Sequence, residues 1–471
     1  MGIVLRGGTV VTAVDYYQAD VRIEGEKVVA LGSGLAQPQD QILNVKGCYL
    51  LPGGIDPHTH FDLPVGETVT ADDFASGTKA AILGGTTTVI DFATQFKGET
   101  LAQAFATWQR KAAGKSYTDY SFHMAITDWS EEIAAEMPEL ADKQGVTPFK
   151  LYMAYKNVLQ VNDAVLLQAL RQAKNEGLLI SLHCENGDIV EVLINKALAQ
   201  GQTAPSYHPV SRPPEAEEEA TARAITLAEI AQAPLYIVHL TCEGALKAVA
   251  EAKRRGVQVY AETCPQYLVL DDSRYRLDGF EGAKYVISPP LRAAANQEAL
   301  WHGLDTGLIN TVATDHCSFN FKGQKEAGLA DFSKIPNGMP GVENRMGLMY
   351  TYGVVPGKIS LNRMVALTAT EPAKLFGLFP RKGTIAPGSD ADLVVWDPSI
   401  NWVISTQAQA HNVDYTPYEG FPQIGKARHV FLRGRQVVAN GQLATGHPGG
   451  NYLSRKPFQP RKVGEDVFTR S

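Results

Sequence analysis

The two ends of the chain share a pattern of short stretches in which apolar and polar residues alternate. Within residues 1–50 these stretches are GIVLRGGTVVTAV, ADVRIEGEKVVALGSG and QILNVKGCYLLPGG, and the pattern returns in KGTIAPGSDADLVVWDP and KARHVFLRGRQVVANGQLA. Alternation with period two between Gly- and Pro-rich turns is typical of β-strands. Because the ends of a domain often lie close together, we predict that residues 1–50 and 382–450 form one discontinuous β-sandwich domain.

The middle of the chain, residues 51–381, has a different pattern. There are eight apolar, β-branched runs. The first ends near residue 60, and the other seven span 86–92, 119–126, 147–153, 178–185, 234–240, 257–264 and 309–316. Helical patterns such as DAVLLQALRQAKNEG separate most of them. Nearly continuous apolar strands that alternate with helices indicate a parallel sheet covered on both faces. Eight such units favour an α/β fold of the (β/α)8 TIM-barrel type, with a doubly wound open sheet as the alternative.

Polar residues stand at or near the ends of these predicted strands. They are His58, His60, Lys150, His183, His239 and Asp315. The carboxyl ends of barrel strands open on one face, which carries the active site in this fold. Side chains two positions apart on a strand share a face, so His58 and His60 point the same way. The joint pattern predicts a metal site, although each residue alone has a simpler interpretation as a hydrogen-bonded core histidine or, for Asp315, a loop cap.

Lys150 is unusual because it lies within the apolar run TPFKLYM. A buried ammonium is costly, and a lysine amine with an ordinary pKa is a poor metal ligand. Lys150 is therefore either a lysine that extends to a solvent-exposed edge or an amine that is chemically changed. A carbamate formed with CO2 would replace the cation by two anionic oxygens that can bridge two divalent ions.

Composition narrows the function classes. The net charge is −7 in 471 residues and the basic residues are dispersed, so we expect neither nucleic acid nor a membrane surface as a partner. The five cysteines have no CxxC spacing and no signal peptide pattern is present, which favours a cytoplasmic location. Residues 451–471 have the pattern of a polar C-terminal arm.

Motifs spread over almost the whole chain resemble the D-hydantoinase/dihydropyrimidinase family of cyclic amidohydrolases. They are PGGIDPHTH, FKLYMAYKN, HCENGD, ETCPQYLVLD, SPPLR, FKGQKE, PNGMPG and GSDADLV. The resemblance implies two divalent ions, zinc by expectation, with His58, His60 and Asp315 on one ion and His183 and His239 on the other. It further implies that Lys150 is carbamylated and bridges both ions, and that the protein is a homotetramer, with a dimer as the alternative.

The resemblance also implies the chemistry. A hydroxide that bridges the metals would attack the ring amide of a dihydropyrimidine or 5-substituted hydantoin and give an N-carbamoyl amino acid. Asp315 would transfer the proton, Tyr155 would stabilise the oxyanion, and the backbones of Ser288 and Asn337 would bind the ring. The candidates for an apolar pocket around the 5-substituent are Leu63, Val65, Tyr152 and Leu159.

Three related classes compete with this interpretation. Related dihydroorotases carry an arginine shortly after HxH to bind a substrate carboxylate, whereas Phe61 and Asp62 follow it here. An allantoinase-like ring opening is the main alternative, and the non-catalytic dihydropyrimidinase-like scaffolds lack ligands that this chain retains. The sequence leaves open the physiological substrate, the preferred enantiomer and the role of His316.

Overall fold

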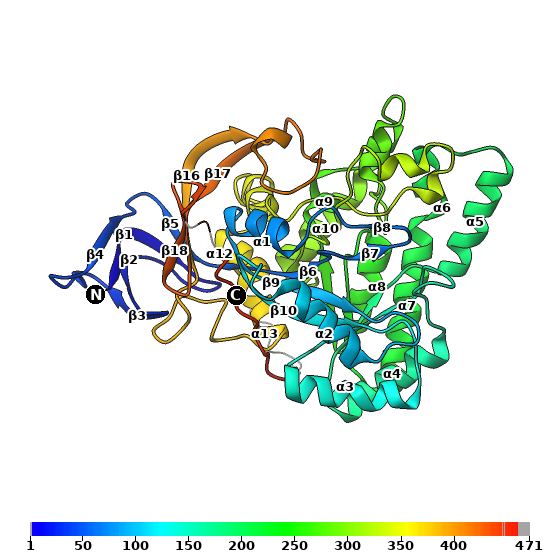
Figure 1. Cartoon of the computed structure of the whole chain (residues 1–471), viewed down its shortest axis with the longest axis horizontal. Coiled ribbons are helices and arrows are strands. Elements are labelled where there is room, and N and C mark those ends of the chain that lie inside the picture. Colours follow the sequence, from blue (N-terminus) through cyan, green and yellow to red (C-terminus); the bar gives the residue numbers. More distant parts are fainter. Residues whose placement is uncertain (1, 445, 447, 460–471) are drawn as a thin grey trace.

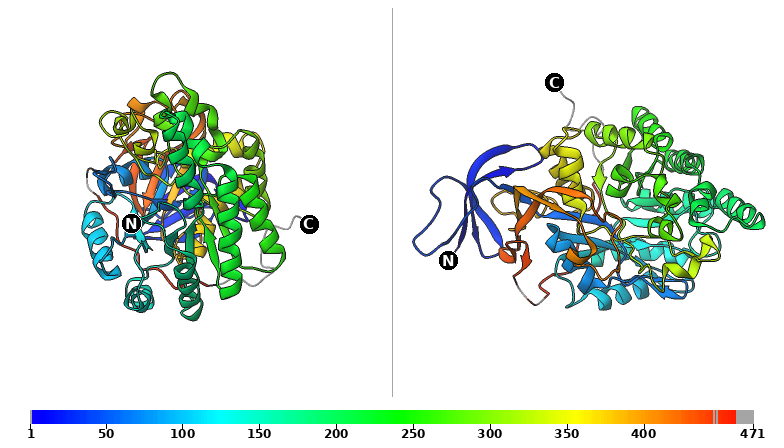
Figure 2. Two further views of the ribbon diagram at one scale, coloured as in Figure 1. Left: turned by 90° about the vertical axis from the view of Figure 1, so that its right-hand side faces the viewer. Right: turned by 90° about the horizontal axis from the view of Figure 1, so that it is seen from above.

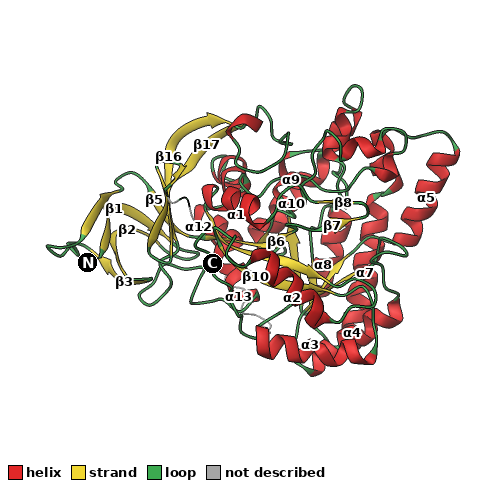
Figure 3. Ribbon diagram, in the orientation of Figure 1, coloured by secondary structure: helices red, strands yellow, loops and turns green. Residues whose placement is uncertain are grey.

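A computed structural model describes residues 2–444, 446 and 448–459. The molecule has a helix-covered barrel and, beside it, a smaller part built from strands (Figure 1). Figure 3 shows that the helices gather around the barrel, while the smaller part is almost entirely strands and loops. Among the described residues, no helix combines the length and the apolar character that crossing a membrane requires.

The barrel consists of eight parallel strands in sequential order. They are β6 (Gly54–Thr59), β9 (Thr86–Thr94), β10 (Asp119–Ala125), β11 (Phe149–Tyr152), β12 (Ile180–His183), β13 (Leu235–Ile237), β14 (Val259–Thr263) and β15 (Thr311–Val312). A parallel bridge between Thr59 and His316 brings the last strand segment back to the first. The eight predicted strands and the TIM barrel are therefore confirmed, and the open-sheet alternative is wrong.

Amphipathic helices follow most of the strands and cover the barrel. The long ones are α1 (Phe74–Leu83), α2 (Leu101–Ala112), α3 (Glu131–Gln144), α4 (Asp163–Asn175), α5 (Gly187–Ala199), α7 (Pro214–Ala231), α8 (Glu243–Arg254) and α10 (Ala295–Thr306). Shorter helices are α6 (His208–Ser211), α9 (Pro265–Val269), α11 (Arg345–Met349), α12 (Leu361–Val365) and α13 (Glu371–Leu375). The side chain of Asp73 caps the backbone at the start of α1, and Thr100 and Asn162 do the same for α2 and α4.

Apolar side chains close the amino-terminal end of the barrel. Ile55 and Ile90 of the barrel strands form a buried cluster with Phe376, which follows α13, and with Leu453 and Phe458 near the C-terminus. The first part of the predicted C-terminal arm therefore packs against this chain's own barrel. Residues 460–471 of the predicted arm lie outside the described residues. With this end filled, the opposite end of the barrel is left for a site.

Strands from both chain ends form one mixed sheet in the smaller part. They are β1 (Ile3–Val11), β2 (Tyr16–Glu24), β3 (Lys27–Gly32), β4 (Gln41–Asn44), β5 (Tyr49–Pro52), β16 (Leu393–Val403), β17 (Pro422–Leu432), β18 (Arg435–Ala439) and β19 (Gln442–Leu443). The halves meet where β5 pairs antiparallel with β16, with Leu51 opposite Val394. Figure 2 shows these segments side by side, the early strands in blue and the late ones in orange. Val10, Leu50 and Phe431 belong to the separate core of this β-sandwich domain.

Candidate active site

Three predicted site residues meet where the first and last barrel strands end. The Nε2 atoms of His58 and His60 lie 3.2 Å apart, and each lies 3.1 Å from Oδ1 of Asp315. The side chains of the two histidines share a face, as strand alternation predicts. The ligand atoms of the three residues all lie within 4.8 Å of one another, which suits a divalent metal ion.

His183 and His239 form a second pair beside this cluster. His183 Nδ1 lies 3.0 Å from His239 Nε2, and the rings of His239 and His58 are 5.5 Å apart between centroids. His239 and Asp315 have positive φ angles of 39° and 51°. Such angles are uncommon for residues other than glycine and often mark sites where function requires a particular orientation.

Lys150 extends from β11 into the same group of residues. Its Nζ atom lies 2.9 Å from His58 Nε2 and 4.2 Å from the ring centroid of Phe92, and the residue is 1% exposed. Among the described residues, no carboxylate makes a salt bridge with this amine. Burial lowers the pKa of Lys150 to about 8. The interpretation of Lys150 as a lysine that reaches solvent at an edge is therefore wrong.

Burial also sets the charge of the neighbouring groups. It lowers the pKa of His58 and His239 well below the usual histidine range and lowers that of His60. Burial opposes ionisation of Asp315, but the hydrogen bond with His60 and the nearby charges of His60, His239 and Lys150 together outweigh it and lower the pKa of the carboxyl group. These residues therefore present neutral imidazoles and one carboxylate, which are the protonation states of metal ligands.

Two acidic residues behind the histidines are functional candidates that the sequence analysis missed. Glu262 Oε1 lies 2.7 Å from His58 Nδ1, and its Oε2 accepts a hydrogen bond from Tyr236. Glu185 Oε2 lies 2.8 Å from His183 Nε2 and also accepts from Arg212. Carboxylates at the second ring nitrogen are typical supports of metal-binding histidines. Glu262 is a charged residue within the apolar run VQVYAETC. The same kind of signal made Lys150 a candidate, so it could also have identified Glu262.

His316 supports the loop beside Asp315. Its Nε2 atom lies 2.9 Å from Asp72 Oδ2, and its Nδ1 atom accepts hydrogen bonds from the backbone amides of Gly341 and Val342. A ring nitrogen that accepts amide hydrogens is unprotonated, so the other nitrogen carries the proton and donates it to Asp72. His316 therefore ties three segments together at the barrel mouth.

The predicted substrate contacts Tyr155, Ser288 and Asn337 also gather here. The ring of Tyr155 lies 5.2 Å from that of His183, and the side-chain amide of Asn337 donates to Ser288 Oγ over 2.9 Å. Burial raises the pKa of Tyr155 to about 12, although Arg212 and the Ser288 hydroxyl oppose the rise. Tyr155 has a φ of 66° and keeps its phenolic proton, so it can donate a hydrogen bond.

The four predicted pocket-lining residues divide into two groups. Tyr152 belongs to a buried cluster with Phe92, and Tyr155 and Leu159 pack against it. Leu63 precedes the short hairpin of β7 (Pro64–Val65) and β8 (Thr68–Val69), and Leu63 and Val65 are both partly buried. The structure thus brings Tyr152 and Leu159 to the site, whereas Leu63 packs against the main hydrophobic core.

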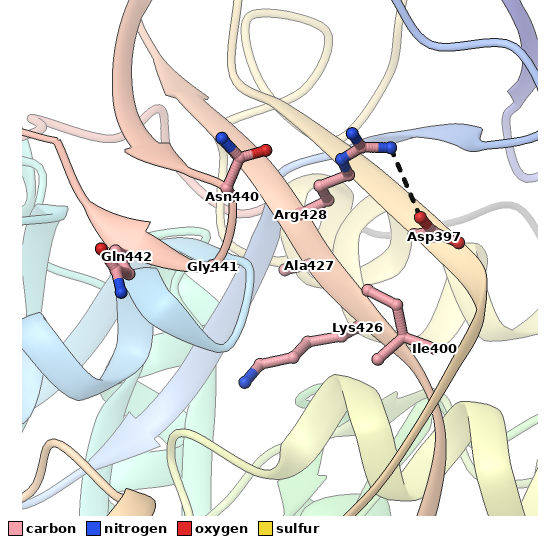
Figure 4. A pocket seen from close by; sticks show the side chains of 8 residues that line it. All are labelled: Asp397, Ile400, Lys426, Ala427, Arg428, Asn440, Gly441 and Gln442. Atoms are coloured by element: carbon pink, nitrogen blue, oxygen red, sulfur yellow. Dashed lines mark ion pairs between the residues drawn. The ribbon is translucent and has the colours of Figure 1, made fainter.

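A separate hollow of about 400 Å³ lies on the β-sandwich domain (Figure 4). It is lined by Asp397, Ile400, Lys426, Ala427, Arg428, Asn440, Gly441 and Gln442. The ion pair between Arg428 and Asp397, 3.5 Å long, lies at its edge (Figure 4). No predicted site residue lines this hollow, so the barrel mouth remains the candidate active site.

Comparison with known proteins identifies the family. The profile of the Amidohydrolase family matches residues 49–437. A D-hydantoinase of Geobacillus stearothermophilus is 48% identical over 468 residues, which are 99% of each chain. The dihydropyrimidinase structure from Brevibacillus agri NCHU1002 has 51% identity and a TM-score of 0.96, over 98% of this chain and 100% of that one. The L-hydantoinase structure from Arthrobacter aurescens has 27% identity and a TM-score of 0.88, over 96% and 99% of the two chains. The chain therefore belongs to the D-hydantoinase/dihydropyrimidinase family of amidohydrolases.

Proposed function

We propose that this cyclic amidohydrolase hydrolyses the ring amide bond of dihydropyrimidines and 5-substituted hydantoins to N-carbamoyl amino acids. The observation that carries the proposal is the joint arrangement at the barrel mouth. There the cluster of His58, His60 and Asp315 adjoins the pair of His183 and His239 and the amine of Lys150, which contacts His58 Nε2. Relatives named D-hydantoinase and dihydropyrimidinase, which match nearly the full chain, support the substrate class.

Two divalent ions, zinc by expectation, fit this donor set. His58, His60 and Asp315 would hold one ion, and His183 and His239 the other. The facing nitrogen atoms of each histidine pair lie 3.2 and 3.0 Å apart. An unprotonated ring nitrogen carries a lone pair, so each pair can offer a nitrogen to a cation. The choice of zinc is a family expectation, because imidazole and carboxylate ligands suit several divalent metals.

Lys150 would bridge the two ions as its carbamate. With a pKa of about 8, part of the amine is neutral near pH 7, and the neutral amine is the form that attacks CO2. A nitrogen–carbon bond forms as one carbon–oxygen π bond of CO2 breaks, and the nitrogen releases a proton to water, which leaves an N-carboxylate whose single negative charge is shared by two oxygens. The absence of a carboxylate partner among the described residues supports this change, because it replaces an unpaired buried cation by an anion among prospective metal ligands.

The residues at the mouth supply the proton transfers. The metal ions, when bound, would polarise the ring carbonyl and lower the pKa of the attacking water. Asp315 would take the proton of the water and deliver it to the ring nitrogen as the carbon–nitrogen bond breaks. The phenol of Tyr155 would donate a hydrogen bond to the oxyanion, which its high pKa permits.

The backbones of Ser288 and Asn337 would bind the ring amide. Among the described residues, no hydrogen bond uses the carbonyl of Ser288 or the amide and carbonyl of Asn337. The carbonyls of the neighbouring Ile287 and Pro289 accept from His208 and Tyr267. Backbone groups of Ser288 and Asn337 thus remain available for a ring with adjacent N–H and C=O groups.

Apolar residues would select the 5-substituent. We propose that Tyr152 and Leu159, together with Leu63 and Val65, line that side of the pocket and favour apolar or aromatic groups. The 48% identity to a D-hydantoinase, against 27% to an L-hydantoinase, supports a preference for the D enantiomer. Rates on the two enantiomers of 5-phenylhydantoin test this, and equal rates would contradict it.

A rate comparison on dihydrouracil, 5-phenylhydantoin and allantoin tests the function. Loss of ring absorbance measures turnover, and metal analysis of the same sample gives the ions per chain. We expect turnover of the first two substrates and about two metal ions per chain. Preference for allantoin would favour the allantoinase alternative, and a metal-free protein without turnover would favour the scaffold alternative.

Assembly and location belong to the same proposal. We expect a homotetramer, as the family resemblance implies, and a cytoplasmic location, as the five cysteines without CxxC spacing favour. Light scattering coupled to size-exclusion chromatography would give the mass of the assembly. A monomer at micromolar concentration would contradict the predicted homotetramer. Fractionation of the producing cell would test the compartment.

A further inference from the structure

Lys325, within the motif FKGQKE, is buried and lies outside the metal cluster. It begins a short 3-10 helix at Lys325–Gly328 and has an exposed fraction of 0%. Its Nζ atom donates to the carbonyl of Val286 over 2.9 Å and to the carbonyl of Pro336 over 2.9 Å. No salt bridge reaches it among the described residues. A fully buried lysine that binds only backbone carbonyls is costly to fold, which calls for a functional explanation.

The two carbonyls belong to the two loops that would hold the ring. Val286 lies two residues before Ser288, and Pro336 directly precedes Asn337. One ammonium group therefore connects both loops next to their substrate-facing backbones. The amide of Gly338 also donates to the Val286 carbonyl over 3.0 Å, which joins the loops directly.

We propose that Lys325 is a positioning residue that sets the separation of the Ser288 and Asn337 backbones and thereby the binding of the ring amide. This inference rests on the proposed function, because the two backbones are assigned to the substrate there. Lys325 itself does not touch the substrate. Its effect should therefore be on binding of the ring, independent of the 5-substituent and of the metal ions.

Steady-state kinetics of Lys325→Met test the proposal. The methionine side chain has a similar length but cannot donate a hydrogen bond, so the two loops lose their shared donor. We expect the KM for dihydrouracil and for 5-phenylhydantoin to rise by about tenfold each, with kcat changed by less than about threefold, because binding common to ground and transition states is lost. Metal content should remain equal to that of the wild type.

Lys322→Met is the matched control. Lys322 is three residues away on the same segment and is exposed. The same substitution there should leave KM, kcat and metal content unchanged. Turnover of dihydrouracil by the wild type tests the proposed function. If the wild type shows no turnover, the proposed function fails, and that result is distinct from a failure of the Lys325 inference. Wild-type turnover together with an unchanged KM in Lys325→Met would overturn the role of Lys325 alone.

Hydrogen exchange separates positioning from general stability. In Lys325→Met we expect faster amide exchange in residues 286–288 and 336–338, with unchanged exchange in β12. Faster exchange spread over the whole barrel would overturn the proposal, because it would mean that Lys325 only stabilises the fold. Lys325→Gln, whose side-chain NH2 keeps two N–H donors on a shorter and uncharged side chain, should give a KM between those of the wild type and Lys325→Met. A KM for Lys325→Gln equal to that of Lys325→Met would show that the donor is not what matters.

Discussion

Two buried lysines, Lys150 at the barrel mouth and Lys382 at the junction of the two domains, have opposite surroundings. Each is 1% exposed. Lys382 Nζ lies 2.5, 2.8 and 3.2 Å from carboxylates of Asp392, Asp119 and Asp390. Burial disfavours the charge of Lys382, but the carboxylates outweigh it and raise the pKa. For Lys150 burial prevails, and the pKa falls to about 8.

This difference separates a structural cation from a reactive amine. Asp119 belongs to β10 of the barrel, and Arg433, from the turn after β17, also pairs with it. The junction cluster thus connects the barrel with the β-sandwich domain through compensated charges. At the mouth, the lysine lacks such compensation, and its neighbours are prospective metal ligands. Burial alone therefore does not reveal the role of a lysine, whereas its partners do.

We expect the substitution Lys150→Ala to have the largest effect, on both ring opening and metal content. Without the amine no bridging carbamate can form, so we expect ring opening to fall to background and the metal content to drop. Turnover assays with metal analysis of the same sample measure both. Retained activity with full metal content in this variant would refute the bridging role.

Lys382→Met should affect stability instead of catalysis. Removing one partner of a buried ion cluster leaves unpaired carboxylates, which costs about 3–5 kcal/mol of unfolding free energy. Urea unfolding measures this loss, and kcat/KM per folded protein should stay unchanged. Arg381→Met is the control, because Arg381 contacts Asp390 from an exposed position and should cost less than about 1 kcal/mol. A metal loss in Lys382→Met would remove the distinction between the two clusters.

Glu262→Gln tests how strongly metal binding at the barrel mouth depends on Glu262, which contacts His58 Nδ1. Loss of this support should weaken metal affinity by about 10–100-fold, as measured by competition with a chelator. Glu217→Gln is the matched control, because Glu217 is also buried and pairs with Arg292 Nη2 at 2.8 Å, but among the described residues it has no hydrogen bond to a histidine. Equal metal affinities in the two variants would mean that Glu262 is only a packing residue.

The smallest expected effect is a pH dependence of stability from Lys325. Burial lowers its pKa to about 7 in the folded protein, against 10.5 for an ordinary lysine. Between these values the unfolded chain binds more protons, so the unfolding free energy rises with pH by up to about 1.4 kcal/mol per unit. We expect the difference in unfolding free energy between wild type and Lys325→Met to follow this rise from pH 7.5 to 9. Lys382, whose pKa is raised, should contribute no such slope in this pH range. If the unfolding free energies of wild type and Lys325→Met change in parallel with pH, that result would contradict the lowered pKa of Lys325.

Much of the barrel and its mouth could be predicted because the signals are local. Apolar runs separated by helical patterns identify the eight strands, and the common direction of parallel strands brings their ends to one face. His58 and His60 were predicted to share a face because alternation along a strand is a property of the backbone. The strand bounds were less accurate, since β13 and β15 are shorter than the apolar runs that predict them.

The supports of the site could not be predicted in the same way. Glu262 contacts His58 across 204 positions of the chain, and Lys325 reaches Val286 across 39. Neither separation follows from a local pattern, because it depends on how loops after different strands fold over the mouth. The segment FKGQKE was noticed as part of a family resemblance, but nothing in it indicates which carbonyls Lys325 binds.

The sequence by itself determined the barrel, the discontinuous small domain and the residue types that end on one face, because strand and helix periodicities follow from backbone geometry. Only the tertiary structure decided which buried charges have partners. The pKa of an amine depends on desolvation and on the charges a few ångströms away, and both arise from contacts between distant segments. That is why burial lowers the pKa of Lys150 and Lys325, whereas neighbouring carboxylates raise the pKa of Lys382 in the same chain.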